Sequence, residues 1–450
     1  MVDRLVESSQ YRHNWSTPAV DRILDDDARL AAWLTIVAAL AQAQADSDII
    51  PRDAAQAISH LTVSDCDQEA IARGTRETGH STLGFIRELQ RVLPEHAKEH
   101  VCFGVTVQDI TDTWFGLVMR DVGRDLIERC DEAMYRALRL AETHRSTAMI
   151  GRTHGQVGAP ITFGLKAASW ADELDRASAR LRDGAQRWSV VQLAGAVGAF
   201  GFLDGEGANV RSRFAQILGL VDPLMSWTTS RDRVAEFGFC ATTLTTTCAR
   251  IGNEIYELQR TEIGEVREAA TRGVVGSITM PHKRNPERSE QVDTLARVAQ
   301  AASGVLQSAM VSSHERDGRS WKAEWWALPE VVLASMTAVE VVVEVLDGLE
   351  VDTDRMMQNM RAGGAYLSQQ VLAQLSKTMG KHRAQNLLQA SLADRSGNED
   401  EEATMLLMAS GAGVAVEDMR AWAQRPDVLE AEIMVDATIA RLGRNAQSSP

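Results

Sequence analysis

A long seam of apolar residues is the feature that most constrains how this chain folds. Between residues 231 and 262 apolar side chains recur at alternating steps of three and four, namely Val234, Phe237, Ala241, Leu244, Cys248, Ile251, Ile255 and Leu258. This spacing gives one apolar face to a long helix and predicts packing within a bundle. The run TTLTTT inside the seam is β-branched and a weaker helix former, by a few tenths of a kcal/mol per residue. We expect the seam to outweigh that preference.

Four other segments carry helical periodicity, at about 107–146, 160–190, 286–313 and 326–347. Helices of this length cannot bury their faces within one thin domain, so we expect a bundle that is shared between subunits. Strand-like alternation is scarce along the whole chain.

The patterns at the two ends of the chain are shorter. Near the N-terminus, Asp26 or Asp27 is expected to cap the helix that runs through LAAWLTIVAALAQAQA. The sequence therefore predicts an all-α protein. Its three expected domains are an N-terminal helical domain over 1–105, a long-helix bundle over 106–348 and a small C-terminal helical domain over 349–450.

The charge and composition narrow the classes of partner. The 450 residues are 44% hydrophobic and carry a formal charge of −15. An acidic surface argues against nucleic acid and against an anionic membrane, although a local cluster of Arg and Lys can still bind a small anion. The start shows no apolar signal region, and the apolar run over 31–45 is too short and too polar to span a bilayer. We expect a cytoplasmic protein.

The cysteines and histidines do not form a metal-binding pattern. Five cysteines are present and none forms a CxxC pair, so neither a disulfide framework nor a zinc cluster is expected. His96 and His100 have the spacing of a metal-binding pair on a helix, but the sequence suggests no third ligand. We therefore expect no metal and no cofactor.

The segment VVGSITMPHKRNPERSE, residues 274–290, interrupts the helical patterns with a polar loop. Ser277 follows a glycine, and the backbone N–H groups of a glycine-containing turn can stabilise an alkoxide or an anion. Lys283 and Asn285 add a cation and an amide, which together can hold a carboxylate. A surface connector is the other interpretation of a stretch rich in Gly, Pro and Asn.

Within this loop, GSITMPHKRNP resembles the signature of the aspartase/fumarase superfamily, G-S-x-x-M-P-x-K-x-N-P, at every fixed position. Other segments resemble the same family in the same order: GVTVQDITDT at 104–113, GRTHGQVGAPITFG at 151–164, SRDRVAEF at 230–237 and HERDGRSWKAEWWALPE at 314–330. The resemblance extends from about residue 12 to the C-terminus. It implies a fumarase/aspartase-like fold with a long central helical bundle, a homotetramer, and active sites built by three subunits.

The resemblance also implies a reaction, β-elimination from a small succinate-type dicarboxylate with release of fumarate. Loss of a proton beside a carboxylate creates a dianion, which needs preorganised positive groups around it. Ser277 would be the base on a mobile loop, with its pKa lowered by backbone donors. His154 would protonate the leaving group while Glu290 orients its ring. General acid–base help of this kind is worth about 10²–10⁴ in rate.

The family also implies a set of substrate-binding residues, namely Lys283, Asn285, Thr106, Thr153, Arg231, Arg316, His80 and Ser230. The two arginines would clamp carboxylates through their guanidinium groups, with an ion pair inside the protein as the alternative role. For His80 the alternative is a structural histidine. The Trp-rich stretch at 321–326 is interpreted first as core packing and second as a pocket wall.

Departures from two branches of the family narrow the substrate. The loop resembles that of adenylosuccinate lyases, whereas WSTPAV and the 314–330 segment resemble 3-carboxy-cis,cis-muconate cycloisomerases. Adenylosuccinate lyases have an Arg-Tyr pair where this chain has Asn14 and Trp15, a histidine at Cys102 and an arginine at Trp325. Those replacements remove the fixed donors that a nucleotide phosphate needs, so they argue against nucleotide recognition.

We therefore favour a lyase that breaks a C–N bond of a small 2-substituted succinate. Aspartate-like compounds, N-substituted aspartates and nitrosuccinate are all within this range. The cycloisomerase and adenylosuccinate lyase activities are the enzymatic alternatives, and an inert, crystallin-like structural relative is the non-enzymatic one. The complete set of Ser277, His154 and Glu290 suits elimination. The presence of Ser277, Lys283, Asn285 and His154 argues against an inert protein.

Overall fold

A computed structural model of the chain describes residues 7–80, 82–270, 277–362, 365–393, 401–424 and 426–447. These residues form eighteen α-helices, three short 3-10 helices and four short strands, so the predicted all-α class is confirmed. By contacts between residues the chain divides into two compact units. Unit 1 comprises 1–129, 177–249 and 291–340, and unit 2 comprises 130–176, 250–290 and 341–450. The three-domain division of the sequence analysis stays a prediction.

The long helices are α7 (Val107–Thr143), α8 (Phe163–Trp188), α10 (Asp232–Gln259), α11 (Glu287–Ser308) and α12 (Gly318–Asp347). Their bounds agree with the predicted segments within a few residues, except at the start of α12. All eight seam residues of α10 are at most 2% exposed. Its threonines are also accommodated: the hydroxyls of Thr243, Thr245 and Thr246 each donate to the carbonyl four residues earlier. The seam therefore outweighs the weak helix preference, as expected.

Helix α12 was predicted to begin near residue 326, but it begins at Gly318. The earlier start follows from Asp317, whose carboxylate accepts the backbone N–H of Arg319 at 3.0 Å and so satisfies a donor of the first turn. Pro329 lies inside the helix without ending it. By length and composition α12 could cross a membrane, but 72% of its most apolar window is buried inside the protein, as in the core helix of a globular fold.

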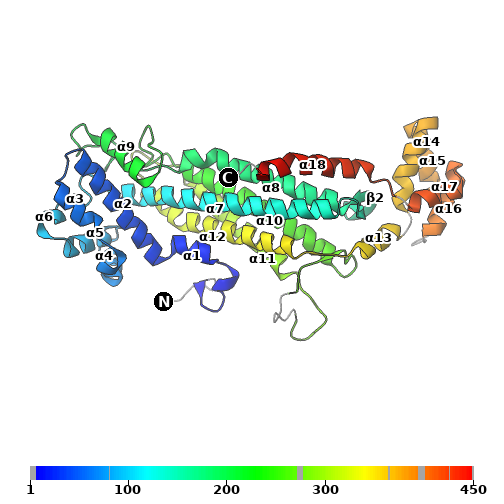
Figure 1. The fold of residues 1–450 in the computed structure, drawn as a ribbon, viewed down its shortest axis with the longest axis horizontal. Coiled ribbons are helices and arrows are strands. Elements are labelled where there is room, and N and C mark those ends of the chain that lie inside the picture. The colour runs from blue at the N-terminus through cyan, green and yellow to red at the C-terminus, as the bar shows by residue number, and fades with distance from the viewer. Residues whose placement is uncertain are drawn as a thin grey trace. The chain divides into compact units, whose positions relative to one another are not determined.

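Unit 1 also contains a group of shorter helices: α1 (Pro18–Leu24), α2 (Asp26–Asp46), α3 (Arg52–Ser59), α4 (Gln68–Thr78), α5 (Leu83–Val92), α6 (Glu95–Lys98) and α9 (Gly207–Leu218). Helix α2 packs against α3 and α9, and α4 packs against α5 (Figure 1). Asp25 caps α2 by accepting the N–H of Ala28 at 2.6 Å. The predicted caps, Asp26 and Asp27, instead lie in the first turn, where their charge complements the helix dipole.

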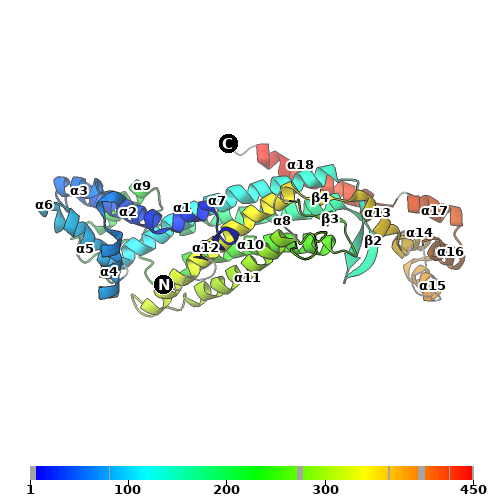
Figure 2. The same ribbon diagram turned by 90° about the horizontal axis from the view of Figure 1, so that it is seen from below.

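Unit 2 contains an antiparallel hairpin that the sequence analysis did not predict, formed by β1 (Ala148–Thr153) and β2 (Gln156–Thr162). A second, very short pair joins β3 (Val266–Arg267) to β4 (Glu350–Val351). The remaining helices are α13 (Thr353–Arg361), α14 (Ser368–Met379), α15 (Lys381–Ala393), α16 (Glu401–Ala412), α17 (Val416–Gln424) and α18 (Leu429–Gln447). Helices α14 to α17 gather into one small group around a buried apolar cluster (Figure 2).

Candidate active site

His154 lies at the tip of the β1–β2 hairpin. The register pairs Thr153 with Gln156, so His154 and Gly155 alone form the turn. Both have positive φ, +53° and +73°. A two-residue turn of this kind needs a left-handed backbone at both positions, and histidine tolerates that conformation better than most residues. The His-Gly pair thus closes the hairpin and leaves both Thr153 and His154 exposed.

The base of this tip is fixed by a buried carboxylate. Arg152 donates to both oxygens of Glu265, at 2.9 Å and 2.6 Å. The amide of Asn359 donates to the same carboxylate at 2.8 Å, and the Glu265 side chain is fully buried. A bidentate, charge-assisted pair of this kind restricts the orientation of the strand that presents His154. The sequence analysis did not find it, because Glu265 is more than a hundred residues away in the chain.

The signature loop is described from Ser277 onward, and residues 274–276 of the predicted mobile loop lie outside the described residues. The hydroxyl oxygen of Ser277 accepts the backbone N–H of Met280 at 3.0 Å. The N–H of Lys283 donates to the carbonyl of Met280 at 2.9 Å, which folds the loop back on itself. Ser277 is half-buried and Lys283 is exposed.

The far end of the loop is anchored through Arg284. Its carbonyl accepts from the Gln259 amide at 3.0 Å, and its guanidinium reaches the carboxylate of Glu350 at 3.0 Å. These contacts fix the backbone at Arg284, and Lys283 and Asn285 lie directly beside it in the chain. Anchors of this kind hold the end of an extended loop in a reproducible conformation.

Glu290 lies in the first turn of α11, as predicted. That helix start is capped by Glu268, which accepts the N–H and the hydroxyl of Ser289 at 2.8 Å and 2.6 Å. Among the described residues of one chain, His154 and Glu290 share no hydrogen bond or ion pair. Their predicted pairing stays a prediction.

In unit 1 the structure brings together two other predicted residues. Arg316 donates through Nη2 to the hydroxyl oxygen of Thr106 at 2.7 Å. The Nε atom of the same guanidinium is buried without a hydrogen-bond partner among the described residues. A buried donor that lacks an acceptor is costly in a folded protein, so an unused N–H beside Thr106 is suited to an incoming carboxylate.

Thr106 is itself held in place by Asp109. The Asp109 carboxylate accepts the Thr106 N–H and the Gly195 N–H, both at 3.0 Å, which ties the start of α7 to the loop at 195. Burial raises the pKa of the Asp109 carboxyl to about 6, although these donors pull it down. The sequence signal was present: an acidic residue three positions after Thr106 is the second half of a capping box.

Arg231 has a different environment from Arg316. Its guanidinium is buried, and each of its five N–H groups faces an acceptor on Asp112, on Glu324, or on the Trp227 and Thr228 carbonyls. Burial disfavours the charge, but the two carboxylates outweigh it and hold the pKa of Arg231 above its usual value. This geometry is that of an internal ion pair, which is the alternative role to a substrate clamp.

The remaining predicted residues lie on exposed loops of unit 1. His80 follows the left-handed Gly79 at the end of α4, and its N–H donates to the Thr78 hydroxyl at 3.3 Å. Ser230 is exposed just before α10.

Cys102, at the place of a family histidine, has its pKa raised to about 12, first by burial and then by the charge of Asp109. The raised pKa favours the neutral thiol, which is a poor substitute for a histidine as an acid–base group.

The three tryptophans of the stretch 321–326 have three separate environments. Trp321 is buried and donates to Asp112 at 3.1 Å, so it belongs to the core around Arg231. Trp325 lines a cavity, and Trp326 is 64% exposed. Both interpretations of this stretch thus apply, each to a different residue.

The helical fold, the signature loop and the hairpin histidine together define a lyase class. A protein-family model described as "Lyase" matches residues 6–301. The chain belongs to this family and is a lyase of the aspartase/fumarase superfamily, as the sequence predicted.

Three known proteins illustrate the range within the family. The chain is 34% identical over 390 residues to the N-acetyl-S-(2-succino)cysteine lyase of Enterococcus italicus, with 86% of each chain covered. It is 37% identical over 386 residues to the nitrosuccinate lyase of Streptomyces davaonensis, covering 82% of this chain and 80% of the relative. The solved 3-carboxy-cis,cis-muconate lactonizing enzyme of Pseudomonas putida superposes with a TM-score of 0.89 at 27% identity, covering 98% of this chain and all of the other.

Proposed function

We propose that this lyase removes a nitrogen-linked substituent from a small 2-substituted succinate and releases fumarate. The observation that carries the proposal is the hydrogen bond from the Met280 N–H to the Ser277 hydroxyl oxygen at 3.0 Å. A backbone donor that points at this oxygen stabilises the alkoxide, which is what a serine base requires. The C–N bond is the finer part of the proposal, because the relatives above include enzymes named for succinocysteine and for nitrosuccinate.

In the proposed mechanism Ser277 takes the proton next to one carboxylate, and Lys283 and Asn285 stabilise the charge that develops on that carboxylate. Arg316 and Thr106 bind a substrate carboxylate through the unused Nε donor and the hydroxyl. His154 gives a proton to the departing nitrogen. In line with the family resemblance, the proposal includes a homotetramer whose sites combine subunits. A cytoplasmic location is part of the same proposal.

The test is the appearance of fumarate, followed by its ultraviolet absorbance, over a panel of aspartate, N-substituted aspartates, nitrosuccinate, adenylosuccinate and S-substituted succinates. Fumarate from aspartate, an N-substituted aspartate or nitrosuccinate supports the proposal, whereas fumarate from adenylosuccinate alone would give the adenylosuccinate lyase alternative. Fumarate only from the sulfur-linked members would contradict the C–N bond while leaving the elimination in place.

The cycloisomerase activity remains the second candidate, because the P. putida lactonizing enzyme superposes on nearly the whole chain. Carboxymuconate is therefore added to the panel. If carboxymuconate reacts and no succinate does, the cycloisomerase assignment replaces the elimination.

A further inference from the structure

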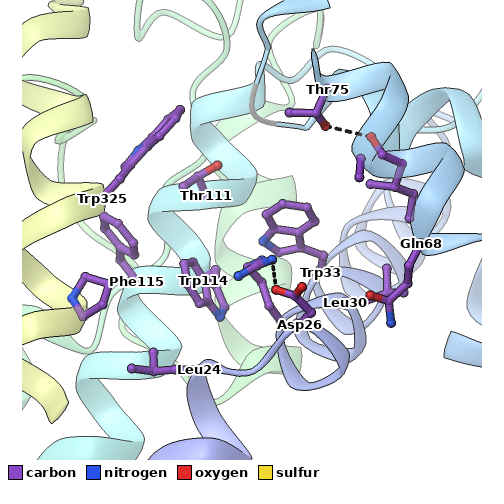
Figure 3. Close-up of a pocket in the computed structure, with 14 residues that line it drawn as sticks. Leu24, Asp26, Leu30, Trp33, Gln68, Thr75, Thr111, Trp114, Phe115 and Trp325 are labelled. Carbon is purple, nitrogen blue, oxygen red and sulfur yellow. Dashed lines mark hydrogen bonds and ion pairs between the residues drawn. The ribbon is translucent and has the colours of Figure 1, made fainter. Parts of the chain in front are cut away.

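Unit 1 contains a cavity of about 540 Å³ between α1, α2, α4, α7 and α12 (Figure 3). Its walls are mainly aromatic and aliphatic, with Trp33, Trp114, Phe115 and Trp325 as the largest contributors. In Figure 3, Thr111 and Trp114 of α7 lie between Trp325 of α12 and Trp33 of α2. The volume falls within the range of roughly 300–1,000 Å³ that is usual for sites of small organic ligands.

Two buried hydrogen-bond donors of this wall have no acceptor. The indole Nε1 atoms of Trp33 and Trp325 are both buried and without a partner among the described residues. Each Nε1 atom has almost no surface open to the cavity, so its indole must turn for the N–H to meet a ligand there. Because buried polar groups in native proteins are almost always paired, an acceptor on a ligand would supply the missing partner. A ligand with a carbonyl or similar acceptor provides one.

The charge of the wall disfavours a phosphate or another free anion. The one cation among the described lining residues is Arg29, which is paired with Asp26 at 2.5 Å. Its guanidinium also lies over the ring of Trp33, at 5.7 Å from the ring centroid. Because Asp26 neutralises this cation, the cavity favours a neutral, flat, apolar body over a charged one.

The cavity is built by the same elements that carry the candidate substrate residues of unit 1. Thr111 lies one turn into α7, the helix that begins directly after Thr106. Trp325 is on α12, the helix that follows Arg316, and Thr75 is in the last turns of α4, just before His80. The helices next to Thr106 and Arg316 therefore also line the cavity. A substrate whose carboxylate binds at these two residues could place its other end there.

From these observations we propose that the cavity is the subsite for the leaving group, and that this group is a neutral aromatic amine with a hydrogen-bond acceptor. This inference rests on the proposed elimination. The C–N bond breaks, the adjacent carbon loses a proton to the base, the electron pair forms the double bond of fumarate, and the departing nitrogen takes up a proton. Ammonia or nitrite is about the size of a water molecule, roughly 30 Å³, and would leave most of the cavity empty.

The first arm of the test measures binding without turnover. Calorimetric titration of the full chain with para-aminobenzamide should show saturable binding. Trp33→Phe and Trp325→Phe keep the aromatic walls but remove one donor each, and each should weaken binding about two- to ten-fold. Ala72→Trp places a large side chain into the cavity and should abolish binding. Trp326→Phe, at the exposed neighbouring position, is the matched control and should bind as wild type does.

No binding by wild type, or binding by both Phe variants that is as tight as that of wild type, would overturn the inference. The same holds if Trp326→Phe loses as much affinity as Trp325→Phe. The Phe variants change only a few atoms, so the result does not depend on whether the larger Ala72→Trp side chain is accommodated. Thermal unfolding of each variant identifies any that fail to fold.

The second arm separates this inference from the proposed function. N-(para-carbamoylphenyl)aspartate should be eliminated to fumarate and para-aminobenzamide with a kcat/KM at least about ten-fold above that of aspartate, and Trp325→Phe should lower that ratio. If wild type acts on aspartate or nitrosuccinate but not on the aryl compound, the leaving-group subsite is wrong and the elimination stands. If no succinate gives fumarate while the binding pattern holds, the proposed function and the leaving-group role both fall, and the cavity remains a ligand site of another kind.

Discussion

Arg316 donates a hydrogen bond to the hydroxyl of Thr106 at 2.7 Å, although 210 residues separate them in the chain. The same guanidinium keeps a buried Nε donor without a partner among the described residues. This pair is the clearest candidate for carboxylate binding within one unit. Arg231, predicted for the same role, has all its donors engaged by acceptors of the protein.

Arg316→Lys should lower kcat/KM by about ten- to hundred-fold, mainly through a higher KM. Lysine keeps the charge but cannot bond Thr106 and a carboxylate at once, and a hydrogen bond to a charged group contributes about 1.5–3 kcal/mol. Steady-state kinetics on the reactive panel member measures the change. Arg319→Lys is the matched control, because Arg319 is 81% exposed and pairs with Asp317. An unchanged KM in Arg316→Lys would remove this residue from the substrate site.

Arg231→Met should reduce the free energy of unfolding by about 3–5 kcal/mol, because it leaves Asp112 and Glu324 buried without their cation. Denaturant unfolding measures the loss. The added Glu324→Gln change should recover part of the stability, since it removes one of the two stranded charges. A substrate clamp would give the opposite pattern, with normal stability and a large loss of activity.

Glu265→Gln should lower kcat more than it raises KM. The change weakens the bidentate hold on Arg152, and His154 at the tip of the same hairpin then loses its fixed orientation. The pH profile of kcat provides a second readout. The apparent pKa of the general acid, which limits kcat on the alkaline side, should shift. Equal kinetics in the variant and the wild type would show that this anchor has no part in placing His154.

The stability of the protein should depend on pH through Asp109. Its folded pKa of about 6 lies above the unfolded value near 3.8, so the folded state binds more protons between these values. Stability from this group is therefore full below about pH 4 and is lost as the pH rises through 6, by about 3 kcal/mol in total. Relative to Asp109→Asn, the wild type should lose unfolding free energy over that window. A difference that does not vary with pH would contradict the raised pKa.

The elements of this fold that follow from local periodicity were predictable from the sequence. The seam of α10 repeats at helical spacing and is buried along its whole length, so both its helix and its packing were visible in the residues. Boundaries were less predictable: Asp25 rather than Asp26 or Asp27 caps α2, and Asp317 starts α12 early. Several acidic residues near each helix start could act as the cap. Which of them does so depends on the backbone geometry, and the sequence alone does not predict it.

The candidate site divides in the same way. Ser277, Lys283, Asn285 and His154 come from contiguous motifs, so a single sequence was enough to select them. The groups that hold them, such as Glu265 for the hairpin and Glu268 for the start of α11, depend on contacts between distant segments. The difference between Arg231 and Arg316 likewise depends on which carboxylates the fold places beside each guanidinium, and only the structure shows that.

The most direct test of the central claim compares Ser277→Ala with Thr279→Ala, a neighbouring hydroxyl of the same loop, on the panel member that wild type converts to fumarate. Our account predicts that Ser277→Ala loses at least about 10³-fold in kcat with an unchanged unfolding midpoint, because the reaction loses its base. Thr279→Ala should stay near wild type. Wild-type turnover by Ser277→Ala would contradict the account.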